Sequence, residues 1–199
     1  MMAPVLLYVL RIRIAPDRLP VIVRRGLRRS GVRDFDGSGM IEIHLSTPVA
    51  APPERVFDLA RSIDLHSRSL DWTGEEPVAG RMSGLIELDE TVTWRARHLG
   101  VRQHLTSRIS AYDRPRYFQD VMVRGAFAWM EHDHWFDAAP GGGTVLRDAM
   151  RFAAPLGVLG RLMETLVLRR YMTRFLERRN AVIKRVAESH DEWRAFLPE

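Results

Sequence analysis

The sequence predicts a single α+β domain over residues 40–199, in which a curved antiparallel sheet of about seven strands wraps a long C-terminal helix. Three observations predict it. An alternating strand opens the domain, a series of such strands occupies its middle, and the final segment changes to helical spacing. A long helix with one apolar stripe needs an apolar surface to cover, and the sheet offers that surface.

The first strand and two short helices are predicted in order. Residues 41–46 alternate between apolar and polar, which is the period of a half-buried strand, and Thr47-Pro48 is expected to end it. A helix should follow, because residues 52–54 supply proline and an acid for its first turn and residues 56–60 are mostly apolar. A second short helix is expected over residues 63–70.

A meander of antiparallel strands is predicted after residue 90. The alternating segments cover residues 91–98, 101–112, 117–124, 128–138 and 144–152. Pro140-Gly141-Gly142-Gly143 is the strongest hairpin signal among the turns that separate them. Consecutive antiparallel strands should therefore be neighbours in one sheet.

The C-terminal segment, from about residue 159 to residue 188, has the spacing of an amphipathic helix. Its apolar stripe consists of Leu159, Met163, Val167, Tyr171, Phe175, Val182 and Val186. Charged residues, with Arg179 among them, are expected on the opposite, solvent-facing side.

The charge is distributed unevenly. Residues 1–39 contain eight arginines, three acidic residues and no lysine, so they hold the whole net charge of +5. The neutral remainder lacks the basic surface that phosphate backbones need, and we expect no nucleic-acid partner. Residues 1–39 are interpreted as a disordered basic extension or as the product of a start codon assigned upstream of Met40. A basic arm or membrane tether is the alternative.

The composition limits compartment and chemistry. The chain has no cysteine, which excludes disulfides, thiolate nucleophiles and cysteine metal sites, and it favours a reducing cytoplasm. The apolar run at residues 1–10 is shorter than the roughly 20 residues that a membrane-spanning helix requires, so no integral membrane segment is expected.

Several short motifs occur in order between residue 40 and about residue 188. They are Ile41-Glu42-Ile43-His44 with Pro48, the run at 52–57, the strand at 92–98, Gly125-Ala126-Phe127, residues 131–134 with Phe136, Gly143-Thr144 with Asp148, and Pro155-Leu156-Gly157. Together they resemble the SRPBCC superfamily, which includes START lipid-transfer domains, polyketide cyclases and birch-pollen-allergen-like proteins. The resemblance implies a helix-grip fold with a cavity between sheet and helix. It selects no function, because this superfamily contains carriers, sensors and enzymes.

Strand alternation predicts which side chains face the helix. The polar ones are His98, Gln103, Asp120, His132, His134 and Asp148. The apolar wall would consist of Trp94, Phe118, Met122, Phe127, Met130, Phe136, Met150 and Met163. Buried acids and histidines need partners or water, so a hydrogen-bonded network lining a partly wet ligand pocket is one interpretation. A filled core with satisfied histidines is the other, and a bulge would turn some of these groups outward.

Three functional hypotheses follow. The first is a binding or carrier protein for a hydrophobic small molecule such as a lipid, a quinone or a polyketide-like compound. The alternative is a cyclase- or dehydratase-like enzyme in which His132 or His134 forms an acid–base pair with Asp120 or Asp148. The third is a partner-binding module that uses the helix or the basic arm. The sequence specifies neither the ligand nor the oligomeric state.

Two of the predicted inward-facing histidines are also candidate metal ligands. His132 and His134 lie on one side of a strand, and with Asp120 or Asp148 they are chemically suitable ligands. Their spacing matches no closed zinc pattern. We therefore expect no metal ion and no cofactor.

Overall fold

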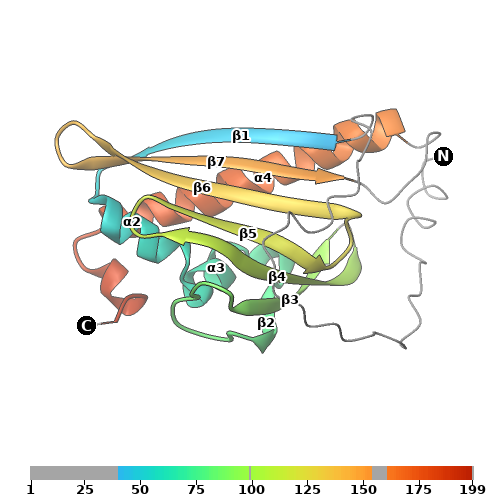
Figure 1. Cartoon of the computed structure of the whole chain (residues 1–199), viewed down its shortest axis with the longest axis horizontal. Coiled ribbons are helices and arrows are strands. Elements are labelled where there is room, and N and C mark those ends of the chain that lie inside the picture. The colour runs from blue at the N-terminus through green and yellow to red at the C-terminus, as the bar shows by residue number, and fades with distance from the viewer. Residues whose placement is uncertain (1–39, 99, 154–160, 199) are drawn as a thin grey trace, which may run out of the picture. The chain divides into compact units, whose positions relative to one another are not determined.

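The computed structural model of the protein describes residues 40–98, 100–153 and 161–198, without the side chains of residues 161–166. In this part of the chain, seven antiparallel strands form one sheet in the order β1-β7-β6-β5-β4-β3-β2 (Figure 1). The strands are β1 (Met40–Val49), β2 (Glu76–Gly80), β3 (Thr91–His98), β4 (Val101–Asp113), β5 (Tyr117–Arg124), β6 (Trp129–Ala139) and β7 (Gly143–Ala153). The helical elements are α2 (Pro53–Ala60), α3 (Ile63–Ser69), η1 (Asp71–Thr73), α4 (Arg161–Glu188) and η2 (Glu192–Ala195).

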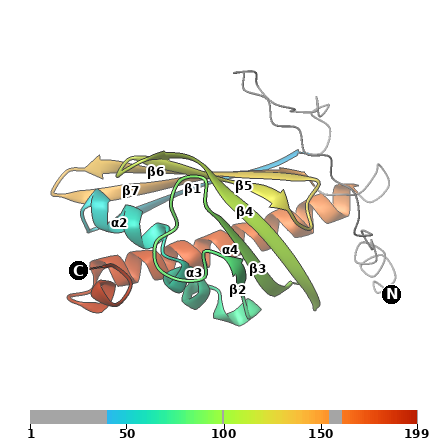
Figure 2. The ribbon, with the colours of Figure 1, turned by 60° about the horizontal axis from the view of Figure 1, so that its bottom comes forward.

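The long helix α4 packs along one face of the sheet. Figure 2 shows the sheet curving over α4, with α2 and α3 on the same side of the sheet as that helix. α4 contacts β1, α2 and α3. The predicted fold class, a curved antiparallel sheet on a long C-terminal helix with two short helices after the first strand, is confirmed. Among the described helices, none combines the length and hydropathy needed to cross a bilayer.

Strand β1 is longer than the sequence predicts. It continues through Thr47-Pro48 to Val49, and Pro48 pairs with Val145 of β7. Proline cannot donate to a ladder, but β1 lies at the edge of the sheet and has only one neighbouring strand to satisfy. Lys184 of α4 donates a 2.6 Å hydrogen bond to the Pro48 carbonyl, which ties this edge to the helix.

Two apolar clusters form the core. The α2 cluster includes Phe57, Leu59, Trp94, Phe118, Phe136, Leu146 and Ile183. The methionine cluster includes Ile41, Leu70, Met130, Met150, Phe152, Met172, Phe175 and Leu176. Along β6, Met130 belongs to one cluster and Phe136 to the other, with His132 and His134 between them. A polar layer therefore divides the core.

The buried face of α4 is rotated relative to the predicted stripe. Val167 was expected to be buried but is 47% exposed, whereas Arg179, expected in solvent, is only 4% exposed. The buried positions are Met172, Phe175, Leu176, Arg179, Asn180, Ile183, Val186 and Ala187. Arg179 is tolerated there because its guanidinium lies 3.6 Å from the Asp148 carboxylate and donates a hydrogen bond to the Ala60 carbonyl.

Three predictions fall outside the described structure. Leu159 and the interpretation of residues 1–39 as an extension lie outside the described residues, and Met163 lies in the part of α4 without described side chains. They remain predictions.

Candidate functional site

Strand register gathers four of the predicted polar residues. Asp120 of β5 lies opposite His132 of β6, and His134 lies opposite Asp148 of β7. Directly opposite and diagonal positions on one face of a sheet are within side-chain reach. The four residues therefore form one group on the face of the sheet that α4 covers.

The two histidines bridge the two carboxylates. Asp148 Oδ1 lies 3.1 Å from His132 Nε2 and 2.9 Å from His134 Nδ1. The remaining ring nitrogens face Asp120 Oδ1, with His134 Nε2 at 3.2 Å and His132 Nδ1 at 3.9 Å. An ionised Asp148 accepts from both rings, which assigns a proton to each of the nitrogens that face it.

Helix α4 closes the group from the other side. Asn180 Nδ2 donates a 2.6 Å hydrogen bond to Asp148 Oδ2, and the Arg179 guanidinium lies beside Oδ1. The ring of Phe118 stacks on His134 with 4.3 Å between centroids. We refer to Asp120, His132, His134, Asp148, Arg179 and Asn180 as the polar layer.

Sequence analysis missed Arg179 and Asn180. Helical spacing contained a usable signal, because positions 172, 176, 179, 183 and 186 also follow a three- or four-residue repeat. An arginine at the centre of that repeat is, however, typical of a solvent-facing residue. Only a buried carboxylate opposite this position makes its burial favourable.

Burial and hydrogen bonding set the charges of the polar layer. Burial alone would raise the pKa of the Asp148 carboxyl, but hydrogen bonds from His132 and His134 outweigh it and hold this pKa well below 3.8. Asp120 follows the same pattern: burial opposes ionisation, but the hydrogen bond from His134 outweighs it and lowers the pKa of the Asp120 carboxyl. Burial, and then the neighbouring His134, lower the pKa of His132. Both carboxylates are thus ionised at neutral pH and His132 is uncharged.

Access to the polar layer is greatest at Asp120. Its side chain is 20% exposed, whereas the side chain of Asp148 is fully buried. Asp120 and Met122 lie on the same face of β5. Any molecule that reaches the polar layer would therefore approach from the Asp120 side.

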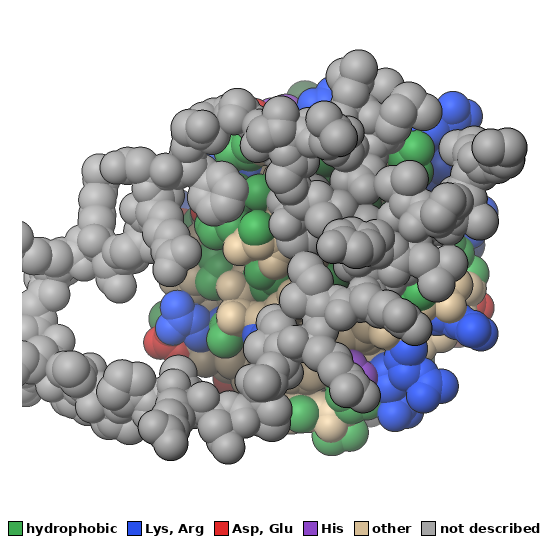
Figure 3. Space-filling model, turned by 90° about the vertical axis from the view of Figure 1, so that its right-hand side faces the viewer, with side chains coloured by type: hydrophobic (Ala, Val, Ile, Leu, Met, Phe, Trp, Pro, Cys, Tyr) green, Lys and Arg blue, Asp and Glu red, His purple; other side chains and the backbone are tan. Residues whose placement is uncertain are grey.

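Partly buried hydrophobic side chains flank the methionine cluster, as they do the α2 cluster. Those that flank the methionine cluster include Leu105, Met122, Phe127, Leu168 and Tyr171. Figure 3 views the domain from the end at which α4 begins, and hydrophobic side chains gather in the middle of this face with Lys and Arg side chains toward its edge.

The predicted apolar wall is divided between the two clusters. Trp94, Phe118 and Phe136 are buried in the α2 cluster. Met130 and Met150 are buried in the methionine cluster, where Met122 and Phe127 are half-buried. Gln103 is half-buried beside Ala96 on the neighbouring strand β3. The half-buried members lie on β4, β5 and the segment that follows β5.

His98 does not join the polar layer. Strand β3 is separated from β5 by β4, and His98 Nδ1 instead shares a 2.7 Å hydrogen bond with the hydroxyl of Tyr171 on α4. Burial lowers the pKa of His98, and the charge of nearby Glu75 opposes this shift. His98 is therefore a polar group separate from the polar layer, and its ring lies next to Phe175 of the methionine cluster.

Glu75 is a buried carboxylate that sequence analysis also missed. It is 6% exposed, and its Oε1 lies 3.3 Å from His66 Nε2. Its Oε2 is buried without a hydrogen-bond partner among the described residues. The His66 ring stacks on Trp94, which places this pair against the sheet. No sequence pattern marked Glu75, because it lies in the short connection between η1 and β2.

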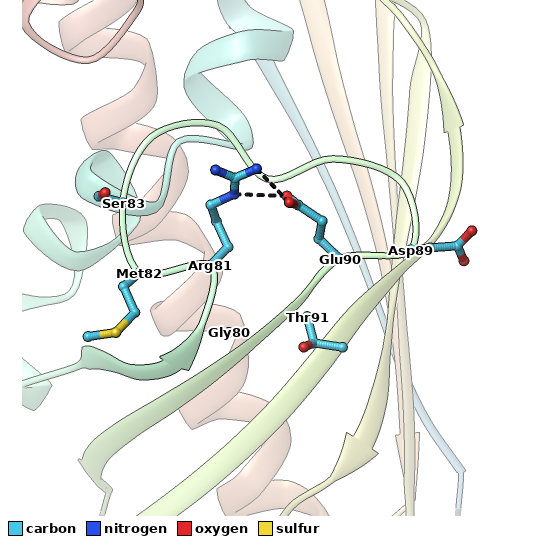
Figure 4. Close-up of a pocket in the computed structure, with 7 residues that line it drawn as sticks. All are labelled: Gly80, Arg81, Met82, Ser83, Asp89, Glu90 and Thr91. Atoms are coloured by element: carbon cyan, nitrogen blue, oxygen red, sulfur yellow. Dashed lines mark hydrogen bonds and ion pairs between the residues drawn. The ribbon is translucent and has the colours of Figure 1, made fainter.

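A separate surface pocket of about 500 Å³ is formed by residues at the connection from β2 to β3. Figure 4 shows Arg81 pointing toward Glu90 across it, and the two side chains form paired hydrogen bonds of 2.9 and 2.5 Å. Its lining comprises Gly80, Arg81, Met82, Ser83, Asp89, Glu90 and Thr91, and includes none of the predicted site residues. This exposed, mainly polar surface does not suit an apolar ligand.

A family model described as polyketide cyclase / dehydrase and lipid transport matches residues 40–188. The chain belongs to this family. That assignment confirms the predicted membership of the SRPBCC superfamily. A search of curated proteins found no match.

Several solved structures share the fold of this chain. The match to TTHA0849 from Thermus thermophilus has a TM-score of 0.56 and 18% identity, covering 72% of this chain and 97% of the other. The match to major latex-like protein 151 from Panax ginseng has a TM-score of 0.54 and 13% identity, covering 75% of this chain and 98% of the other. The match to Ara h 8.0201 has a TM-score of 0.52 and 14% identity, covering 73% of this chain and 98% of the other. At these identities the likeness shows the fold alone.

Proposed function

We propose that this protein binds a hydrophobic small molecule, such as a lipid, a quinone or a polyketide-like compound, and acts as a carrier or binding protein. The ligand would lie between the sheet and α4 against the methionine cluster. One observation carries the proposal: that cluster has a half-buried rim of Leu105, Met122, Phe127 and Tyr171. Methionine and aromatic side chains form adaptable apolar surfaces.

Polar groups near this cluster would orient the ligand. The Glu75 Oε2 is buried without a partner among the described residues, and an unpaired buried carboxylate oxygen is costly. A ligand hydroxyl or amine would satisfy it. The charge of Glu75 influences the pKa values of both His98 and Tyr171, so all three groups lie in one region. We therefore expect a mainly apolar ligand with at least one hydrogen-bond donor.

Competition with an apolar fluorescent dye tests the proposal. The wild-type protein should bind the dye, and a fatty acid should displace it. Met122→Glu should weaken binding by at least about tenfold, because it places a charge on the apolar rim. Val123→Glu is the matched control, since Val123 is the next residue of β5, is exposed and faces the opposite side of the sheet. Equal binding by the two variants would contradict the proposed location.

Native mass spectrometry of the protein from its host provides a second test. We expect an extractable apolar ligand of defined mass, and the same spectrum reports the oligomeric state. Protein that carries no ligand and takes up neither dye nor fatty acid would count against a binding function. The cysteine-free composition still predicts a reducing compartment such as the cytoplasm.

The polar layer favours a second candidate, a cyclase- or dehydratase-like enzyme. Buried carboxylate–histidine pairs with shifted pKa values are the groups that general acid–base catalysis uses. In this alternative Asp120 and His132, at the accessible side of the layer, would exchange a proton with the bound molecule. Incubation of the protein with its extracted ligand should then give a product of altered mass. Conversion that persists in folded Asp120→Asn and His132→Ala variants would remove this candidate.

A further inference from the structure

We propose that Asp120, His132 and His134 form a binding site for a divalent transition-metal ion such as Zn²⁺. Each residue offers one ligand atom, and these atoms all lie within 4.8 Å of one another. The inference is independent of the apolar ligand, because it rests on the polar layer alone.

The spacing of the ligand atoms fits a metal ion. Zn–N and Zn–O bonds of about 2.0–2.2 Å in a tetrahedral site place neighbouring ligand atoms about 3.4 Å apart. Asp120 Oδ1 lies 3.2 Å from His134 Nε2 and 3.9 Å from His132 Nδ1. Both of these separations lie within about 0.5 Å of the tetrahedral value, and the third lies within 4.8 Å.

The outer contacts of the histidines are a second, independent observation. The nitrogens that do not face Asp120 both contact Asp148 Oδ1. Metal-binding histidines usually donate their other N–H to such a carboxylate, which fixes the ring and the tautomer. Asp148 is held in turn by Asn180 and Arg179. Asp148 would therefore orient the ligands without binding the ion.

Charge also favours a cation at this position. The carboxyl groups of Asp120 and Asp148 share a layer in which the Arg179 guanidinium is the nearby cationic group, 3.6 Å from Asp148. Both ring nitrogens of His134 face carboxylate oxygens, at 3.2 and 2.9 Å. A cation between Asp120 and the two rings would also use His132 Nδ1, which has no partner within hydrogen-bond distance among the described residues.

Nitrogen and carboxylate ligands select the class of ion. Imidazole suits Zn²⁺, Co²⁺, Ni²⁺ or Fe²⁺ and disfavours Mg²⁺ and Ca²⁺. Three protein ligands leave a fourth position open, as in catalytic rather than structural zinc sites. Because Asp120 is the most exposed of the three ligands, that position would be reached from the Asp120 side of the polar layer.

The strand register supplies what the sequence pattern lacks for a metal site. Residues 132 and 134 alone match no closed zinc pattern, and the sequence does not reveal that Asp120, on another strand, lies opposite His132. The β5–β6 register completes the set of three.

Direct metal binding tests the proposal. The full chain, expressed without a polyhistidine tag and treated with chelator, is titrated with Zn²⁺ by calorimetry and with Co²⁺ by visible absorption. We expect one ion per chain and a raised melting temperature. Asp120→Asn and His134→Ala should weaken Zn²⁺ binding by more than about 100-fold, and Asp148→Asn by about 10- to 100-fold.

The control variants are His44→Ala and His104→Ala, which replace exposed histidines outside the layer and should bind Zn²⁺ like the wild type. Circular dichroism establishes which variants are folded, and Asp120→Asn remains informative if His134→Ala does not fold. The proposal is overturned if the folded wild type takes up no Zn²⁺ or Co²⁺. It is also overturned if folded Asp120→Asn binds Zn²⁺ as tightly as the wild type does.

Discussion

Replacing Asp148 by asparagine should destabilise the protein strongly, although the two side chains have the same shape. Asp148 is fully buried and contacts His132, His134, Arg179 and Asn180. Asparagine lacks the charge, and its amide nitrogen cannot accept from these donors. Removing one partner of a buried ion pair costs about 3–5 kcal/mol, because the other charges stay buried and unpaired. We expect a loss of that size in the free energy of unfolding.

Urea denaturation followed by tryptophan fluorescence measures this loss. The matched control is Asp137→Asn, which breaks the exposed pair between Asp137 and Arg147 on the same hairpin. Exposed pairs contribute about 0–1 kcal/mol, so this variant should unfold almost like the wild type. The wild type and both variants are treated with chelator, so that metal binding does not affect the measured stabilities. A loss below about 1 kcal/mol for Asp148→Asn would refute the assigned role of the polar layer.

Three further predictions concern pH, backbone and domain limits. In chelator-treated protein, the lowered pKa values of Asp148 and Asp120 stabilise the fold above the ordinary carboxyl pKa of 3.8. The free energy of unfolding should therefore fall as the pH is lowered below that value, and urea titrations at several pH values can measure this loss. Gly80→Ala should cost at least about 2 kcal/mol in the same assay, because φ is +76° and a Cβ would lie 2.1 Å from the Thr91 carbonyl oxygen. A chain that starts at Met40 should match the melting temperature of the full chain, and a drop of several degrees would show that residues 1–39 contribute to stability.

Much of the candidate site follows from strand alternation. The pattern placed Asp120, His132, His134 and Asp148 on the face toward the helix, and the hydrogen bonds between them show that they share one face. The same rule brought in His98, which lies on that face but contacts Tyr171 instead. Alternation identifies the face of a residue and is silent about its neighbours on other strands.

The amino-acid sequence by itself determined most of the elements, their order, the fold class and the polar strand residues that turn inward, because alternation and helical repeat are local consequences of backbone geometry. The tertiary structure alone decided which of those groups meet and which face of α4 is buried. Register and helix rotation depend on packing between residues far apart in the chain, and Arg179 lies inside only because Asp148 is there to receive its charge.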